Sequence, residues 1–210
     1  MAPLRNFFSL TNFFRRCNMP DTGVLTFASI TSDPAAGTSS WTNASNAATE
    51  DSNAAFYDAV SGASQILKCL NPNPSIPAGA TIDGVKVEIK RKRASSGANM
   101  HDALVQLYVG GVLVGSNKAD AATRWPTSFT FATYGGPSDT WGLTGGSALT
   151  AAQVNSSNFG IGIQGSIDSN SADDGQIDFV RMTIYYTAAA VAVGLVNGGL
   201  TRGLNRGLVS

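Results

Sequence analysis

Apolar and polar residues alternate strictly over residues 85–89, where Lys86 and Glu88 separate the apolar side chains. A period of two is typical of a strand with one buried and one solvated face. The same signal recurs downstream and predicts further strands at residues 105–109, 112–114, 129–131, 159–163 and 180–186. In the run at 159–163, Gly160 and Gly162 take the positions opposite the apolar side chains.

The connections between these strands are rich in residues that favour turns. Gly110 and Gly111 separate two apolar runs, which is the pattern of a two-residue hairpin. Gly, Asn, Asp and Ser fill the other loops, and no convincing long helix is present. The pattern predicts an all-β fold, an antiparallel jelly-roll-like β-sandwich with extended N- and C-terminal arms. We expect the sandwich at 24–187, the N-terminal arm at 1–23 and a Gly/Leu-rich C-terminal arm at 188–210.

The pattern is weaker before residue 81. Residues 24–27 fit an edge strand, and residues 32–53, rich in Ser, Ala, Thr and Asn, are typical of a long loop. Residues 54–70 fit either a helix or a strand. Within them, residues 64–70 favour a strand, because three prolines follow within seven residues.

The N-terminal arm repeats the sequence Asn-Phe-Phe and so carries four large aromatic residues, Phe7, Phe8, Phe13 and Phe14. Left in water, each would forgo about 1.5–3 kcal/mol of burial. We therefore expect this arm to dock on another surface. The alternative is a non-native extension, because Met19 could itself be a start.

The C-terminal arm repeats Gly-Leu four times, at Leu195, Leu200, Leu204 and Leu208. On a helix the last three leucines would share one face. However, each interior glycine costs about 1 kcal/mol relative to alanine, and the five glycines of this segment forbid a stable isolated helix. We expect the arm to be held by a partner chain or a neighbouring subunit. These leucines and the four phenylalanines are the predicted assembly residues.

Composition and charge exclude several classes of protein. The 210 residues include 14 basic and 14 acidic ones, which argues against a basic nucleic-acid coat. A hydrophobic content of 43% argues against a disordered chain, and no apolar run is long enough for a membrane span. A single histidine excludes a multi-histidine metal centre. Only 13% of residues are charged, and such a surface near neutrality favours self-association.

Candidate chemistry is sparse. His101 precedes Asp102, but no GxSxG nucleophile motif accompanies them, so we interpret the histidine as structural or solvated. The segment from Asp168 to Asp174 is rich in oxygen ligands that suit calcium, but the same residues are common in hairpin loops, and we favour the plain loop. Cys17 and Cys69 are interpreted as free thiols. No catalytic residue, metal or cofactor is predicted.

Two further groups of residues are open to a functional interpretation. The basic run at 86–93 favours a solvated strand face or inter-subunit salt bridges over a nucleic-acid contact, with Arg91 to Arg93 entering a loop. Trp125, Tyr134 and Trp141 lie in a Gly-rich belt. These rings could plug the sandwich or an interface, or they could stack on a sugar face.

Four segments of the chain resemble a pattern found in uncharacterised structural proteins of tailed bacteriophages. They are IPAGATIDGV at 76–85, YGGPSDTWG at 134–142, NFGIGI at 158–163 and VRMTIYY at 180–186. The resemblance covers roughly residues 40–187 and leaves out both arms. It implies a component of the virus particle, without catalytic residues.

The resemblance and the residue patterns together predict a non-enzymatic virion protein. We expect a capsid decoration or cement protein, or a fibre protein, anchored to neighbouring subunits by its arms. The expected partners are copies of itself, as a dimer or trimer, and other virion proteins such as the major capsid or tail proteins, with no nucleic acid and no membrane. The alternative is a glycan-binding β-sandwich module of a tail fibre or adhesin.

Overall fold

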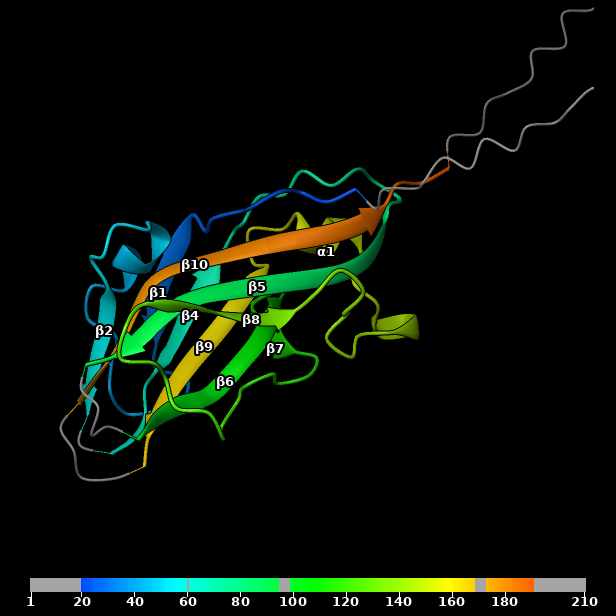
Figure 1. Cartoon of the computed structure of the whole chain (residues 1–210). Coiled ribbons are helices and arrows are strands. Elements are labelled where there is room, and N and C mark those ends of the chain that lie inside the picture. The colour runs from blue at the N-terminus through cyan, green and yellow to red at the C-terminus, as the bar shows by residue number, and fades with distance from the viewer. Residues whose placement is uncertain (1–19, 60, 95–98, 169–172, 191–210) are drawn as a thin grey trace, which may run out of the picture.

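The predicted all-β fold is confirmed by a computed structural model, which describes residues 20–59, 61–94, 99–168 and 173–190. Two antiparallel sheets pack face to face around one hydrophobic core (Figure 1). The first sheet has the order β1 (Ser29–Asp33), β4 (Ile66–Leu70), β9 (Gly160–Ile167), β6 (Met100–Val109), β7 (Val112–Val114), and β3 (Gly62–Ala63) also pairs with β9. The second has the order β2 (Ala55–Ala59), β10 (Asp173–Thr187), β5 (Thr81–Arg93), β8 (Thr130–Gly135). The jelly-roll form of this sandwich stays a prediction.

Helical structure in the described residues is limited to three short segments. Two are 3-10 turns, η1 (Ala44–Ala48) and η2 (Gly145–Ser147), and the third is the four-residue helix α1 (Ala151–Val154). Thr150 caps α1 through a reciprocal pair of hydrogen bonds with Gln153. No helix in the described part of the chain is long and apolar enough to cross a membrane.

The strands follow the predicted alternation. In β5 the side chains of Val85, Val87 and Ile89 are fully buried in the core. The turn at Gly110 and Gly111 joins β6 to β7, as predicted, and both glycines have a positive φ. The strand predicted at 64–70 is β4, and the other predicted strands match β6, β8, β9 and β10.

Two details of the sequence prediction need correction. Residues 24–27 form no strand of their own, but Asp21 and Leu25 make single bridges to β10 along the part of its edge that β2 leaves open. The loop expected at 32–53 contains the end of β1 and the turn η1. In both segments the backbone forms isolated bridges or a short turn. Such contacts do not produce an alternation of apolar and polar residues from which they could be predicted.

The two ends of the sandwich differ, and we name them by what they carry. At the arm end, Tyr186 N–H donates to the Pro20 carbonyl at 3.0 Å and Thr22 N–H donates to the Ile184 carbonyl at 3.1 Å. The first described residue therefore lies beside the end of β10, at the same end of the sandwich as the last described residues (Figure 1). The opposite end, the loop end, carries the connections that contain residues 95–98 and 169–172.

Candidate functional site

The arm end holds an open apolar groove. One cavity of about 600 Å³ is lined by the loop before β5, by η2 and by α1, mainly with small side chains such as Ala78, Ala148 and Ala152. A second cavity of about 420 Å³ is lined by Val109, Val114, Leu143 and other residues. Leu149 lines both cavities, so they adjoin. We call the two together the end groove.

The walls of the end groove are fixed to each other by hydrogen bonds. The side chain of Asn155, directly after α1, accepts from Ile76 N–H at 2.9 Å and donates to the Ile76 carbonyl at 2.8 Å. Thr81 bridges to Thr150 at the start of α1. These hydrogen bonds fix the positions of the groove walls relative to each other.

The chain leaves β10 against the rim of this groove. A Cβ built on Gly79, which lines the groove, would lie 3.4 Å from the Cβ of Ala189. Ala189 belongs to the predicted C-terminal arm, so the described start of that arm contacts the groove. The predicted assembly residues Phe7, Phe8, Phe13, Phe14, Leu195, Leu200, Leu204 and Leu208 lie outside the described residues.

A second notable site is a polar cluster in the core, formed by Arg91, Asp102, Trp125 and Tyr134. Asp102 is fully buried, and its carboxylate accepts from Trp125 Nε1 at 2.7 Å and from Tyr134 Oη at 2.6 Å. Arg91 on β5 forms an ion pair with the same carboxylate. A backbone bulge in β6 between Asp102 and Leu104 shifts the alternation and turns Asp102 into the core.

The guanidinium of Arg91 is held by rings as well as by charge. Its Cζ lies 4.9 Å from the centre of the Trp125 ring and 5.6 Å from that of Tyr134. Burial raises the pKa of Tyr134 from its ordinary value of 10.0 to about 12, so the phenol stays a donor at neutral pH. Arg91 lies on β5 and Asp102 on β6, so the cluster links the two sheets. Arg91 is 5% exposed and Asp102 is fully buried, which leaves no room for a substrate.

Of the two interpretations of Trp125, Tyr134 and Trp141, the structure agrees with burial inside the sandwich and not with stacking on a sugar. The two indoles are fully buried and Tyr134 is 7% exposed. Trp141 Nε1 donates to the Val85 carbonyl at 2.9 Å, which fixes its ring beneath the sheet. These rings close the sandwich and present no free face to a sugar.

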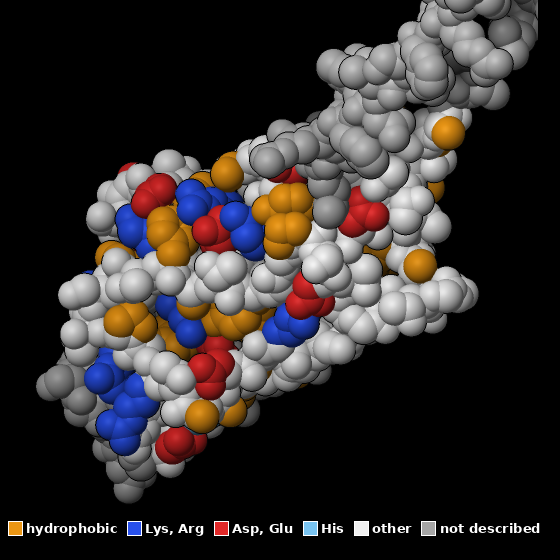
Figure 2. All heavy atoms as spheres, turned by 45° about the vertical axis from the view of Figure 1, so that its right-hand side comes forward, with side chains coloured by type: hydrophobic (Ala, Val, Ile, Leu, Met, Phe, Trp, Pro, Cys, Tyr) orange, Lys and Arg blue, Asp and Glu red, His pale blue; other side chains and the backbone are white. Residues whose placement is uncertain are grey.

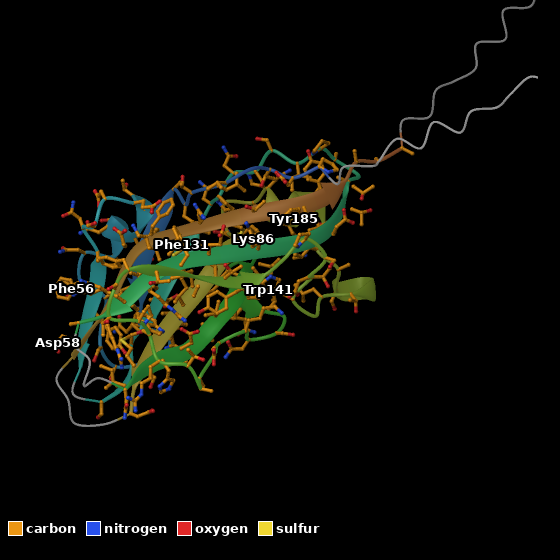
Figure 3. The ribbon with its side chains drawn as sticks, in the orientation of Figure 1. Phe56, Asp58, Lys86, Phe131, Trp141 and Tyr185 are labelled. Atoms are coloured by element: carbon orange, nitrogen blue, oxygen red, sulfur yellow. The ribbon has the colours of Figure 1, made fainter. Side chains whose placement is uncertain are left out.

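The basic run is paired within the chain. Lys86 contacts Glu88 at 3.1 Å, and Lys90 contacts Asp178 at 2.8 Å on the outer face of the second sheet. Arg181 forms a further ion pair with Glu88. Figure 2 shows acidic and basic side chains adjoining on the face it presents, and Figure 3 labels Lys86 among them. These cations are largely neutralised by acids of the same chain.

One expectation about this run is therefore wrong. The strand β5 continues to Arg93, so Arg91 to Arg93 do not enter a loop. Lys86 and Lys90 lie on the outer face of the sheet and form salt bridges within the chain, and bridges between subunits stay a prediction. Phe131, labelled in Figure 3, also packs on this face, with its ring 4.2 Å from the Cζ of Arg181.

The remaining candidate residues are His101, the segment 168–174 and the two cysteines, and those that the structure describes form no catalytic arrangement. His101 Nδ1 lies 3.4 Å from a carboxylate oxygen of Asp168. The segment considered for calcium includes residues 169–172, which lie outside the described residues, and no group of three metal-ligating side chains occurs in the part that is described. Cys69 is buried in β4 as a free thiol, and burial raises its pKa; Cys17 is outside the described residues.

Comparisons with protein-family models, with curated proteins and with solved structures found no match.

Proposed function

We propose that the protein is a non-enzymatic structural component of a tailed-phage particle. Its role is that of a capsid decoration or cement protein, or of a fibre protein, held on neighbouring subunits by its two arms. The resemblance of four segments of the sandwich to structural proteins of tailed phages supports this class. Its partners would be further copies of the chain and other virion proteins.

The observation that carries the proposal is the common exit of both arms. The hydrogen bonds of Pro20 and Thr22 to the end of β10 bring the start of the domain beside its end. Residues 1–19 and 191–210 therefore start from one side of the sandwich. An accessory protein fastened at that side would project its body from the particle.

The composition of the arms supports the same role. Phenylalanine and leucine side chains in the arms stabilise an assembly only when a neighbour buries them, and that burial offsets the cost of ordering the chain. The sandwich itself has a closed core and internally paired charges. Fold stability and attachment would thus be carried by separate parts of the chain.

The test is incorporation into particles after changes confined to the C-terminal arm. A variant with Leu195, Leu200, Leu204 and Leu208 changed to serine keeps the length of the arm and removes its large side chains. A matched control changes Asn197, Thr201 and Asn205 to serine or alanine. We expect the leucine variant to fold but to be lost from particles, and the control to be incorporated.

Incorporation of the leucine variant at the level of the unchanged protein would refute the role of the C-terminal arm. Incorporation of neither the variants nor the unchanged protein would refute the virion role altogether. Unfolding curves of the purified chains distinguish a failure to attach from a failure to fold.

A further inference from the structure

We infer that the end groove binds the Gly-Leu segment of its own chain, residues 194–208, when the protein is free in solution. This inference goes beyond the proposed function, because it concerns the state of the arm before any assembly. It identifies a binding site inside the domain and names its occupant.

The first argument is the chemistry of the groove. Its lining is mostly alanine, glycine, leucine and valine, including Ala78, Ala148, Leu149 and Val114. Several of these small apolar residues, such as Ala148 and Ala152, are exposed in the described structure. A groove of this kind favours aliphatic side chains and close approach of a backbone, and none of the residues that line it is charged.

The second argument is the sequence of the segment. Leucine side chains supply the aliphatic groups, and the adjacent glycines let the backbone approach the small residues of the lining. The glycines also disfavour a helix, so the segment would lie in the groove as an extended chain. Two adjoining cavities that share Leu149 suit successive leucines of one extended segment.

The third argument is distance along the chain. Ala189 already lies against Gly79 on the rim of the groove. Leu195 lies five residues beyond Ala190 in the sequence, a span of at most about 18 Å. The segment is thus tethered at the site at a high effective concentration, which favours its own groove over that of a second copy.

The test is hydrogen exchange measured by mass spectrometry on the full-length protein. We expect the amides of residues 194–208 to exchange about tenfold or more slowly than in a variant whose groove is blocked. The blocking change is Ala152→Arg, which places a charge in the groove at an exposed position. The matched control is Ala122→Arg, at an exposed position in the connection between β7 and β8.

A second variant leaves the domain untouched. Leu200→Asp together with Leu204→Asp should speed exchange in the segment to the same extent as Ala152→Arg. Exchange in β9 and β10 should stay unchanged in all variants and thereby report that the sandwich is folded.

Three outcomes would overturn the inference. Equally fast exchange in the unchanged protein and in Ala152→Arg would mean that the segment is not bound. Protection that survives Ala152→Arg would place the segment elsewhere. Protection that disappears on about 100-fold dilution would assign the groove to the arm of a second copy. None of these outcomes depends on incorporation into particles, so the two proposals fail separately.

Discussion

The polar cluster and the end groove lie towards opposite ends of the sandwich and differ in burial and polarity. Near the loop end, Asp102 receives hydrogen bonds from two rings and an ion pair from Arg91, all inside the chain. At the arm end, an open apolar surface is left uncovered by the described residues, at the end of the sandwich where Pro20 pairs with Tyr186. The difference separates a region that holds the sheets together from a region suited to receive another segment.

Burial explains why changes in these two regions should have unequal effects. A charge enclosed in the core is stabilised only by its partner, because no water can replace that partner. A small exposed side chain at the groove can be changed while the core stays intact. The predictions below, from the largest expected effect to the smallest, are designed to test this contrast.

Removing the carboxylate of the polar cluster should have the largest effect on stability. Asp102→Ala leaves the guanidinium of Arg91 buried without its counter-charge, and we expect the free energy of unfolding to fall by about 3–5 kcal/mol. Denaturant unfolding measures this change. The double variant Arg91→Met with Asp102→Leu removes both charges and should be much less destabilised, and equal losses in both variants would contradict the ion-pair explanation.

Tyr134→Phe should cost less, about 1–3 kcal/mol, because only one hydrogen bond to Asp102 is lost. The control is Tyr185→Phe on the outer face, labelled in Figure 3, for which we expect a change within about 0.5 kcal/mol. Unfolding measured at neutral pH compares the two.

Alkaline pH sharpens this prediction. Burial raises the pKa of Tyr134 to about 12, so its contribution to stability is complete below pH 10.0 and is lost as the pH rises through about 12. The gap between the unchanged protein and Tyr134→Phe should therefore narrow over this range. A gap that widens would contradict the assigned direction of the pKa.

Glu88→Gln should show a smaller, acid-sensitive effect on the outer face of the second sheet. Burial acts to raise the pKa of Glu88, but hydrogen bonds from Arg181 and Lys86 outweigh it and hold the pKa below its ordinary value of 4.5. The ion pairs thus contribute stability above pH 4.5, and this is lost as the pH falls through the lowered pKa. We expect a loss of about 0.5–1 kcal/mol at neutral pH.

The measurement is the free energy of unfolding of both proteins from neutral to acid pH. The difference between them should shrink as Glu88 is protonated in the unchanged protein. A difference that is constant with pH would show that the ion pairs of Glu88 do not contribute.

Ala152→Arg should have the smallest effect on stability, within about 0.5 kcal/mol, because the residue is exposed at the groove. The melting temperature of the variant checks this. A loss as large as that expected for Asp102→Ala would mean that the groove is part of the stabilising core, and the contrast between the two regions would fail.

The parts of this fold that the sequence predicts are those where alternation is regular. Val85 to Ile89 and the apolar positions of β9 and β10 show the period of two that the strands follow. The same period extends to Arg91 and could have placed it in the core, but a positive charge followed by two more suggested a loop. The strand is therefore regular as far as Arg93, but the charge of Arg91 concealed its inward-facing position.

Other features depend on contacts that no local pattern encodes. Asp102 points inward only because a bulge shifts the alternation of β6, and a bulge leaves no clear mark in the sequence. The end groove joins residues 78–81 to residues 145–155, which are far apart in the chain. The arms are predicted from composition alone, whereas the closeness of the first described residue to the end of β10 depends on the hydrogen bond between Pro20 and Tyr186.

The most direct test of the virion role is sedimentation of a lysate from the native source, with the protein located by peptide mass spectrometry. We predict that the chain travels with particles of megadalton size, and that its abundance relative to the major shell protein separates a decoration protein from a tail or fibre protein. Recovery only at the top of the gradient, as a monomer or small oligomer, would contradict the proposal.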